Sequence, residues 1–478
     1  MELIKGPLIG MVPPPLDDDL LFKLLFSAEA LEAVFRERFA TTTGKGIDRL
    51  NGFQFSARSK AQFAVVSEKI ISGRFRFSPY LEVLRPKSRD KKPRLIGIPT
   101  VRDRVVLHQL NKFLAAKFPE RVPKNVASTY VRELSQGLQS LPKDTTWICS
   151  TDIQTFYDDI RQPRLLWLLR KRVSCEAVNK LVGHAIATPT VPKNTGRARH
   201  KDYVSKGVPQ GLAISNILAS IFMQDVDDAM KDAGVTYYRY VDDVLMYGSE
   251  EPVRKAFASL KKRLAYRGLK LHSVASGKTH VEPLAKPFGY LGYTFCMPTI
   301  SVRSSTVEKF LQTIAAKFSD YAHNKAKRLE KFKYLNEERL NSIFLLELNE
   351  RISGAISEKR RYGWIAYFSQ INDLTLLHKL DDAIAGMFSR LPEFGGKPPA
   401  DLKQLKRAFH EIKYKPLGGY ISNYDLIESP AEMLTFLVAR GRVSDDELLT
   451  DAQIVERFEK YRKKALATMH ADEGVLYG

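Results

Sequence analysis

The segment YYRYVDDVLMYG, residues 237–248, constrains the fold more than any other stretch, because it places two adjacent carboxylates, Asp242 and Asp243, inside an apolar run. The β-branched and aromatic residues on both sides show no helical period, which predicts two strands joined by a tight connection. A solvated hairpin tip would normally carry Gly, Asn or Ser. Two carboxylates in such surroundings are costly unless a cation neutralises them. A metal ion such as Mg²⁺, which prefers a few carboxylates together with substrate phosphates, would do so.

The charge of the chain indicates a polyanionic partner. The 478 residues include 75 Lys and Arg against 54 Asp and Glu, a net charge of +21, which favours nucleic acid first and an anionic membrane second. No apolar run approaches the roughly 18 residues of a membrane span, and no signal peptide is visible. The cysteines, without CxxC spacing, are expected to be buried in a reducing compartment: Cys149, Cys175 and Cys296. We therefore expect a cytoplasmic protein without a membrane partner.

The periodicity of apolar residues divides the chain into four regions of an α+β protein. Residues 1–145 mix helices with short strands, and residues 146–300 alternate strands with amphipathic helices. Residues 301–394 have mostly helical spacing. Several Gly and Pro breakers then precede a last helical region, residues 395–478.

Two further segments complete the pattern around the paired acids. In TTWICSTDIQTFYDDI, Asp152 is expected at the end of a strand, where it could share two metal ions with Asp242. Asp158 is interpreted as a local cap or turn residue. In KGVPQGLAISN, glycines and a proline predict a rigid turn, and a helix is expected to begin near Ser215.

Five segments resemble the palm motifs of reverse transcriptases, in the same order along the chain. They are STDIQTFYDDI, GVPQGLAISN, YVDD, GLKLHSVASGKTHV and FGYLGYTF. Upstream, KPRLIGIPTVRDRVVLHQL looks like the fingers motif of the bacterial enzymes, those of group II introns especially. The resemblance covers roughly residues 44–390. It implies a right-hand polymerase with fingers (1–145), an RRM-like antiparallel palm sheet (146–300), a helical thumb (301–394) and a helical C-terminal region (395–478).

Within this family the chain resembles most the defence-associated, abortive-infection type. Ser215–Asn216 stands where intron-type enzymes have Ser-Pro, and no zinc-binding or nuclease-like Cys/His cluster is visible. The implied function is RNA-directed DNA polymerisation, with a non-coding RNA used in defence against phage. Two alternatives stay open: a group II intron-type maturase or mobility enzyme, and a non-catalytic RNA-binding protein on a polymerase scaffold.

The resemblance also implies roles for the acidic residues and one lysine. Asp152 and Asp242 would bind two Mg²⁺ ions, with Asp243 as a supporting carboxylate and the Ile153 carbonyl as a further ligand. Lys278 corresponds to the lysine that is a candidate general acid for pyrophosphate. A surface lysine without that role is nearly as well supported.

Five residues are implied to bind the incoming dNTP. Arg94 matches the position that holds the triphosphate and base, which suits a planar guanidinium, and Lys92 would assist it. Tyr157, beside Phe156, matches the residue that excludes a 2′-hydroxyl. Gln210 would contact the template or the incoming base, although a turn residue satisfied by the backbone explains it equally well.

The remaining assignments concern the bound nucleic acid. Gly211, Gly292 and Tyr293 would lie near the template and the primer end. The basic thumb residues would contact duplex phosphates: Lys325, Lys327, Arg328, Arg360 and Arg361. Trp364 would lie in the minor groove or, with equal support, in the thumb core. The expected partners are an RNA template, a DNA product and dNTPs, and a homo-oligomer is left open.

Overall fold

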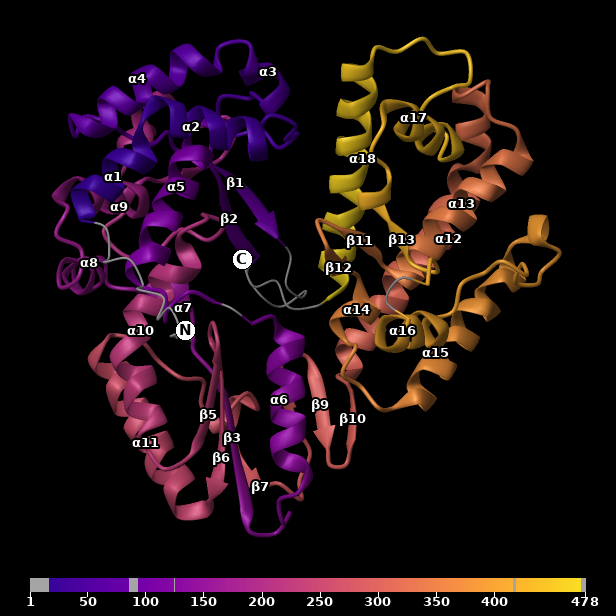
Figure 1. Cartoon of the computed structure of the whole chain (residues 1–478). Coiled ribbons are helices and arrows are strands. Elements are labelled where there is room, and N and C mark those ends of the chain that lie inside the picture. The colour runs from indigo at the N-terminus through magenta and orange to yellow at the C-terminus, as the bar shows by residue number, and fades with distance from the viewer. Residues whose placement is uncertain (1–16, 86–92, 124, 416–417, 474–478) are drawn as a thin grey trace, which may run out of the picture. The chain divides into compact units, whose positions relative to one another are not determined.

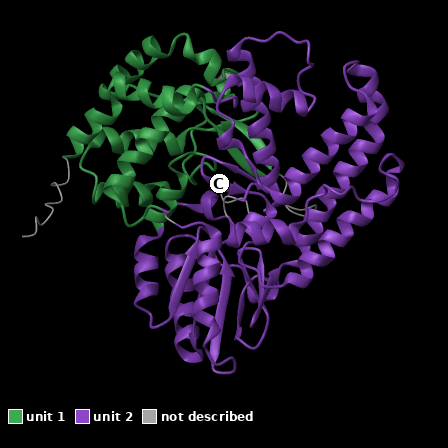
Figure 2. Cartoon of the chain, turned by 45° about the vertical axis from the view of Figure 1, so that its right-hand side comes forward, with its two compact units in different colours: residues 1–40, 45–122, 161–222 green, residues 41–44, 123–160, 223–478 purple. Residues whose placement is uncertain are grey.

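The computed structural model describes residues 17–85, 93–123, 125–415 and 418–473. The chain divides into two compact units, each built from segments that are separated in the sequence (Figure 2). The first unit comprises residues 1–40, 45–122 and 161–222, and the second comprises residues 41–44, 123–160 and 223–478. Residues 161–222 thus pack with the N-terminal segments, across the region boundary that the sequence predicted at residue 145.

The first unit combines helices with a small sheet (Figure 1). Its elements are α1 (Asp18–Phe26), α2 (Ala28–Val34), the π-helical turn η1 (Phe35–Phe39), α3 (Gly52–Ser56), α4 (Ser59–Ile71), β1 (Tyr80–Arg85), β2 (Arg94–Ile98), α5 (Val101–Lys117), α8 (Gln162–Arg170), α9 (Glu176–Ala187), β4 (Thr190–Val191), the 3₁₀ turn η2 (Arg197–Lys201) and the start of α10 (Ser215–Lys231). Asp17 caps α1 by accepting a hydrogen bond from the backbone N–H of Leu20. β1 pairs antiparallel with β2 and parallel with β4.

The second unit holds the larger sheet and a long helical part. Its elements are α6 (Ala127–Gln139), β3 (Thr146–Asp152), α7 (Phe156–Asp159), the end of α10, β5 (Thr236–Tyr240), β6 (Asp243–Ser249), α11 (Glu250–Tyr266), η3 (Val274–Ser276), β7 (His280–Pro283), β8 (Phe288–Tyr290), β9 (Tyr293–Cys296), β10 (Thr299–Val302), α12 (Ser304–Lys331), α13 (Glu337–Ser353), β11 (Ala355–Ser357), β12 (Arg360–Tyr362), α14 (Trp364–Tyr367), α15 (Leu374–Gly386), η4 (Met387–Arg390), η5 (Pro392–Phe394), α16 (Leu405–Tyr414), β13 (Ser422–Asn423), η6 (Tyr424–Leu426), α17 (Pro430–Ala439) and α18 (Asp451–Asp472).

A four-stranded sheet with the order β5-β6-β3-β7 lies at one end of this unit, and all its neighbouring strands are antiparallel. Helix α11 packs on β3 and β6, and α6 contacts β5. Leu245 and Tyr247 share a core with residues of α6, while Val244 and Met246 are buried on the opposite face. Because both faces of β6 are covered, the strand is a continuous apolar run.

The β5–β6 hairpin confirms the tight connection that the paired acids predicted. Its turn consists of Val241 and Asp242, and Val241 has a φ of 58°, which is strained for a β-branched residue. The guanidinium of Arg239 donates to the Val241 carbonyl oxygen at 2.9 Å and to the Asp227 carboxylate at 2.7 Å. Tyr237 also donates its hydroxyl hydrogen to Asp227, at 3.0 Å. A largely buried ion pair to α10 therefore holds the strained turn.

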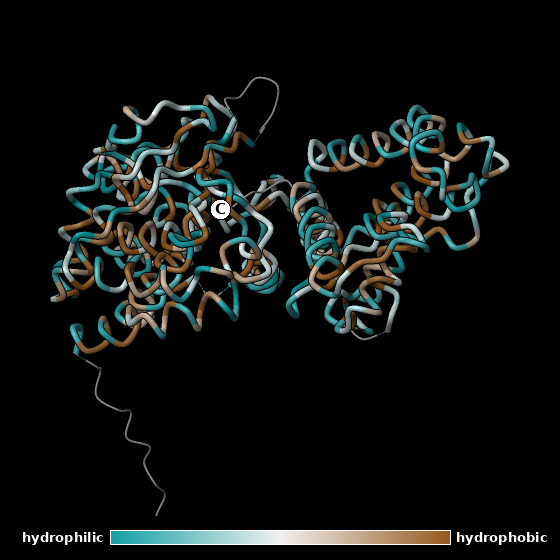
Figure 3. The backbone as a smooth tube through the Cα atoms, turned by 90° about the horizontal axis from the view of Figure 1, so that it is seen from above, coloured by the Kyte–Doolittle hydropathy of each residue, from teal (hydrophilic) through white to brown (hydrophobic). Residues whose placement is uncertain are grey.

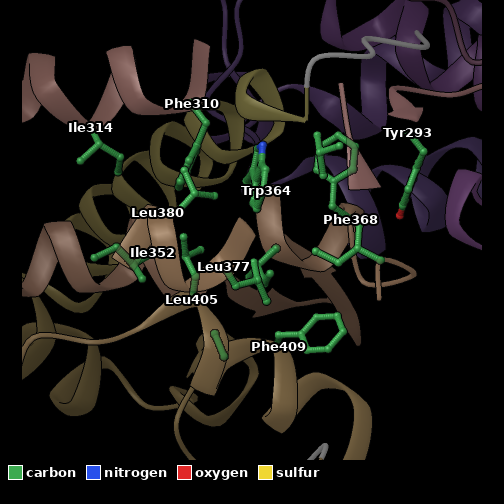
Figure 4. Packing of buried hydrophobic residues seen from close by; sticks show 14 of the residues in the cluster. Tyr293, Phe310, Ile314, Ile352, Trp364, Phe368, Leu377, Leu380, Leu405 and Phe409 are labelled. Carbon is green, nitrogen blue, oxygen red and sulfur yellow. The ribbon is translucent and has the colours of Figure 1, made fainter. Parts of the chain in front are cut away.

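A single apolar core connects the sheet with the helices that follow it. It runs from α6 and β6 through β8–β10 into α12–α16, and Trp364 stacks on Phe310 with 4.9 Å between ring centroids (Figure 4). Trp364 is 1% exposed, which places it in the core and favours that alternative. Figure 3 shows apolar and polar stretches alternating along the helices, as in amphipathic helices that cover a core.

The C-terminal region has its own smaller core and completes a third sheet. Residues from α17 and α18, among them Leu437, Phe458 and Met469, pack with Tyr424 and with Ala355 of β11. β13 pairs parallel with β11, which itself pairs with β12. Beyond residue 395 the described chain forms the helices α16, α17 and α18 and the strand β13. The β11–β12 hairpin and β13 were not predicted.

The cysteines follow the prediction only in part. Cys149 and Cys175 are buried, but Cys296 is exposed. The prediction was wrong for Cys296 because it is the last residue of β9, after the core-facing Phe295, where alternate residues point away from the core. Within the described ranges, no helix has the length and apolar character needed to cross a membrane.

We expect the substitution Asp227→Ala to lower the free energy of unfolding by about 3 kcal/mol, because it leaves the buried Arg239 guanidinium without its carboxylate. Urea denaturation of both proteins would measure the loss. Asp228→Ala, on the same helix but with a side chain 50% exposed, is the control. Equal losses for the two variants would contradict a special role for the buried pair.

Candidate active site

Three carboxylates meet at one end of the large sheet. Asp152 is the last residue of β3 and pairs in register with Asp243, the first residue of β6. Asp242 precedes Asp243 in the hairpin turn, and its carbonyl oxygen accepts a hydrogen bond from the Ile153 N–H at 3.0 Å. The sheet register therefore brings together acids that are 90 positions apart in the sequence.

This end of the sheet carries an excess of negative charge. Burial, followed by the charges of Asp242 and Asp152, raises the pKa of Asp243 well above its ordinary value, and Arg303 and Lys278 oppose that shift. Desolvation and like charges both disfavour ionised Asp243. The electrostatic cost expected from the sequence is thus present in the structure, and a bound cation would relieve it.

A lysine and a histidine contact the first of these acids. The Lys278 ammonium donates to Asp152 Oδ2 at 3.0 Å and to His272 Nε2 at 2.9 Å. Since an ammonium group can only donate, His272 accepts through Nε2. The backbone N–H of His272 also donates a hydrogen bond to the Asp152 carbonyl oxygen at 3.1 Å. The sequence analysis missed His272, which no metal-ligand spacing marks; its place six residues before Lys278, in GLKLHS, was the available signal.

The donor set fits a hard divalent cation. In the part of the chain that the structure describes, no three Asp, Glu, His or Cys side chains are spaced to ligate one ion. The Lys278 ammonium forms an ion pair with Asp152, so this carboxylate already has one positive charge beside it. Carboxylate oxygens are the ligands that Mg²⁺ prefers. Asp152 and Asp242 are the residues that would hold it, with Asp243 and the Ile153 carbonyl beside them.

The two aromatic residues assigned to the nucleotide site follow directly after β3. Phe156 and Tyr157 begin α7, are 3% and 8% exposed, and have ring centroids 5.5 Å apart. The residue before them, Thr155, has a φ of 44° and turns the chain sharply out of the strand. The role of Tyr157 in sugar discrimination stays a prediction.

Three of the assigned residues belong to the first unit. Arg94 begins β2, and the Gly97 N–H of this strand donates to the Gln210 carbonyl oxygen at 2.8 Å. Gly211 has a φ of 98°, and a Cβ there would lie 2.9 Å from the Gly97 carbonyl oxygen. The PQG turn therefore packs on β2. The close approach explains why residue 211 is a glycine. Lys92 lies outside the described residues.

The β8–β9 turn places its tyrosine inside the molecule. Tyr293 is 0% exposed and donates its hydroxyl hydrogen to the Tyr367 carbonyl oxygen at 2.5 Å. Figure 4 shows Tyr293 among the core residues of this unit. Gly292 has a φ of 83° in the turn before it. A contact with the primer would therefore involve the backbone of the turn and not the Tyr293 ring.

The basic thumb residues are not equally available. Lys325 pairs with Glu337 at 3.1 Å and with Glu393 at 2.9 Å, and Arg328 pairs with Asp320. Their charges are partly neutralised within the protein. Lys327 and Arg360 are exposed. Phosphate binding stays a prediction for all the assigned thumb residues, and it has the better support at the exposed ones.

Comparison with known proteins agrees with this geometry. Residues 85–295, which include β2, the large sheet and all three carboxylates, match the family model described as "Reverse transcriptase (RNA-dependent DNA polymerase)". This segment is thus similar to reverse transcriptase domains. The three carboxylates and Lys278 all lie within the matched residues.

Three curated proteins resemble the reverse transcriptase domain and its surroundings. Protein YkfC of Escherichia coli is 25% identical over 43% of this chain and 54% of its own length. An uncharacterized 91 kDa protein in the cob intron of Schizosaccharomyces pombe is 29% identical over 40% of this chain and 23% of its own length. The group II intron-encoded protein LtrA of Lactococcus lactis is 22% identical over 53% of this chain and 40% of its own length. The chain thus spans about half, or less than half, of the length of these relatives.

Two solved telomerase structures also overlap with the chain at 14% identity. Apo telomerase from Candida tropicalis covers 48% of this chain, and 55% of that chain is matched, with a TM-score of 0.37. Telomerase from Candida albicans, in complex with a fragment of telomeric RNA, covers 68%, with 64% of that chain matched and a TM-score of 0.42. Both scores lie below the level at which a shared fold is assigned.

We expect Asp243→Asn to stabilise the protein in the presence of a metal chelator. The raised pKa of Asp243 means that the folded state binds its proton more tightly than the unfolded state does. The wild type therefore loses stability as the pH rises from the ordinary pKa of Asp through the raised one. The variant should gain on the order of 1 kcal/mol or more at neutral pH, and the gain should shrink as the pH falls from the raised pKa toward the ordinary one.

Chemical denaturation from pH 4 to pH 8 would measure this difference. The exposed Asp144→Asn, in the turn before β3, is the control, and we expect no such pH-dependent gain from it. A variant less stable than the wild type at every pH would show that the three carboxylates do not repel each other as the geometry indicates.

Proposed function

We propose that this protein is an RNA-directed DNA polymerase that extends a primer with dNTPs through a two-metal mechanism. The observation that carries the proposal is the meeting of Asp152, Asp242 and Asp243 at one end of an antiparallel sheet within a reverse transcriptase domain. The chain order of that sheet, a strand, helices, two strands, a helix and a strand, also suits an RRM-like palm in a right-hand polymerase.

The chain's own residues have distinct tasks in this proposal. Two Mg²⁺ ions, when bound, supply charge stabilisation to the attacking 3′-oxygen and to the leaving pyrophosphate. Asp152 and Asp242 would hold them, and Asp243 would add negative charge beside these two residues. Lys278 carries a proton on Nζ that it can give to the departing pyrophosphate. His272 accepts a hydrogen bond from the same Nζ and so keeps the ammonium beside the site.

The substrates follow from the charge and from the domain. A net charge of +21 suits an RNA template and a DNA product. Arg94 would bind the dNTP triphosphate, and Tyr157 would exclude the 2′-hydroxyl of a ribonucleotide. Lys327 and Arg360 would contact duplex phosphates. We further propose a cytoplasmic location, and a homo-oligomer remains compatible with this function.

Asp242→Ala should abolish dNTP incorporation on an RNA template in Mg²⁺, with a loss of at least about 100-fold, the scale for removing one group that stabilises developing charge. Incorporation of labelled dNTPs, measured beside a thermal melting curve, tests this. Asp144→Ala, which removes an exposed carboxylate, should retain activity. A folded Asp242→Ala protein with full activity would end the assignment.

Two alternatives are separated by related measurements. A group II intron-type maturase is favoured by the names of two relatives, one encoded by a group II intron and one in the cob intron. Detecting self-splicing RNA among the nucleic acids that co-purify with the protein would support it. A wild type that binds RNA but incorporates no dNTP in Mg²⁺ would instead support the non-catalytic alternative.

We also propose a role in defence against phage, with a dedicated non-coding RNA as the template. Two features support it: the meeting of three carboxylates at one end of the large sheet, and a C-terminal region with a core of its own beyond the proposed thumb.

We expect cells that carry the gene to reduce phage plaque counts, and Asp152→Ala to remove this protection. Plating a broad phage panel on cells with the wild type, the variant or an empty vector measures it. Equal plaque counts in all three would contradict the defence role while leaving the polymerase proposal intact, because that proposal depends on dNTP incorporation alone.

A further inference from the structure

The β11–β12 hairpin has an unusual turn. Ser357 pairs with Arg360, so the two turn residues are Glu358 and Lys359, whose φ angles are 51° and 59°. Two successive residues in the left-handed region form the turn that fits a two-residue hairpin, but Asn-Gly is the sequence that favours it. Neither Glu nor Lys adopts this conformation readily. The turn therefore needs support from outside the hairpin.

That support comes from one carboxylate of the C-terminal region. Asp425 Oδ1 accepts a hydrogen bond from the Glu358 N–H at 2.6 Å, and Oδ2 accepts one from the Lys359 N–H at 2.8 Å. Both oxygens thus bind the backbone of the two strained residues. The Asn423 side chain in turn accepts a hydrogen bond from the Asp425 N–H at 3.0 Å, which fixes the position of Asp425.

Asp425 is itself anchored in the interior of the second unit. The preceding residue, Tyr424, is 2% exposed and donates its hydroxyl hydrogen to Glu350 of α13 at 2.7 Å. Arg440 of α17 and Tyr461 of α18 contact the same buried carboxylate, each at 3.3 Å. The C-terminal region is therefore tied to the thumb helix α13 directly behind the residue that supports the turn.

The hairpin is also rigid at its base and along one strand. A Cβ on Gly354 would lie 2.2 Å from the Tyr362 carbonyl oxygen, so the two ends of the hairpin approach closely. β13 pairs with β11 along its outer edge. Arg361 donates to the Ile412 carbonyl oxygen at 3.0 Å, which turns its side chain toward α16. Lys359 and Arg360 are exposed at the tip, and Arg361, one residue further along β12, is exposed as well.

We propose that Asp425 is a positioning residue, and that the C-terminal region holds the β11–β12 turn in a strained shape that directs Lys359 and Arg360 toward the phosphates of bound nucleic acid. The proposal rests on the proposed function, and it gives the region after residue 394 a task. It also accounts for Lys359 at a turn position where Gly would fold more easily, because the tip needs a cationic side chain.

The sign of one substitution separates this role from simple electrostatics. Asp425→Ala removes a negative charge near the binding surface, which by charge alone should strengthen the binding of a polyanion. If Asp425 positions the turn, the same substitution should weaken binding. The exposed Asp446→Ala, also in the C-terminal region, changes the net charge equally without touching the hairpin and is the matched control.

The measurement is the affinity of the full chain for a fluorescent DNA primer annealed to an RNA template, by anisotropy over a range of salt concentrations. D425A should raise the Kd severalfold and lower the log–log salt slope by about 1 to 2, the loss of one or two phosphate contacts. D446A should leave the Kd unchanged or slightly lower. Thermal melting of each variant verifies folding.

A rescue tests the positioning itself. The substitutions E358N and K359G together install the sequence that favours this turn, at the cost of the Lys359 side chain. With them present, adding D425A should no longer change the Kd or the slope. If D425A weakens binding equally in this background, Asp425 acts by another route and the positioning role is overturned.

A direct variant covers the case in which D425A fails to fold. K359Q with R360Q leaves Asp425 and the backbone in place and should lower the salt slope by about 1 to 2. An unchanged slope would overturn the proposal. The Asp242→Ala experiment measures dNTP incorporation, whereas the hairpin experiments measure affinity for nucleic acid. Failure of the hairpin proposal can therefore be distinguished from failure of the polymerase proposal.

Discussion

Mutual repulsion among three carboxylates at one end of a sheet is the constraint on which the rest of this structure depends. Burial and the charges of Asp242 and Asp152 raise the pKa of Asp243. Specific hydrogen bonds hold the chain in this unfavourable arrangement. The Ile153 N–H, directly after β3, donates a hydrogen bond to the Asp242 carbonyl oxygen in the hairpin turn. The Arg239 guanidinium donates one to the Val241 carbonyl oxygen of the same turn. A strained turn and an unfavourable charge cluster at the same place are typical of a functional site.

The meeting of the three carboxylates could be predicted from the sequence, because the pattern that indicates it is local. Apolar strands around paired acids, and a strand ending at Asp152, each depend on a few neighbouring residues. The sheet register then decides their approach, and an antiparallel order with two covered faces leaves few alternatives. His272 escaped prediction because its contact with Asp152 depends on a loop that folds back on β3, and the sequence marks it only by its place six residues before Lys278.

The parts that the sequence could not predict depend on contacts between distant segments. Residues 161–222 join the N-terminal segments, although nothing in their periodicity separates them from the sheet that follows. The ion pairs of Lys325 with Glu337 and Glu393 were likewise not predicted, because they join residues that are far apart in the sequence. A short β11–β12 hairpin with Glu and Lys in its turn carries no turn signal, since its conformation is imposed by Asp425, 66 residues further along the chain.

The exposure of Cys296 has a practical consequence for following this protein in solution. The chain contains three cysteines, and the other two are buried. Burial raises the pKa of the Cys149 thiol to about 12 and that of Cys175 to about 11, so both remain protonated and unreactive at neutral pH. A maleimide dye should therefore attach at one native position, on the β9–β10 hairpin, without any engineered cysteine.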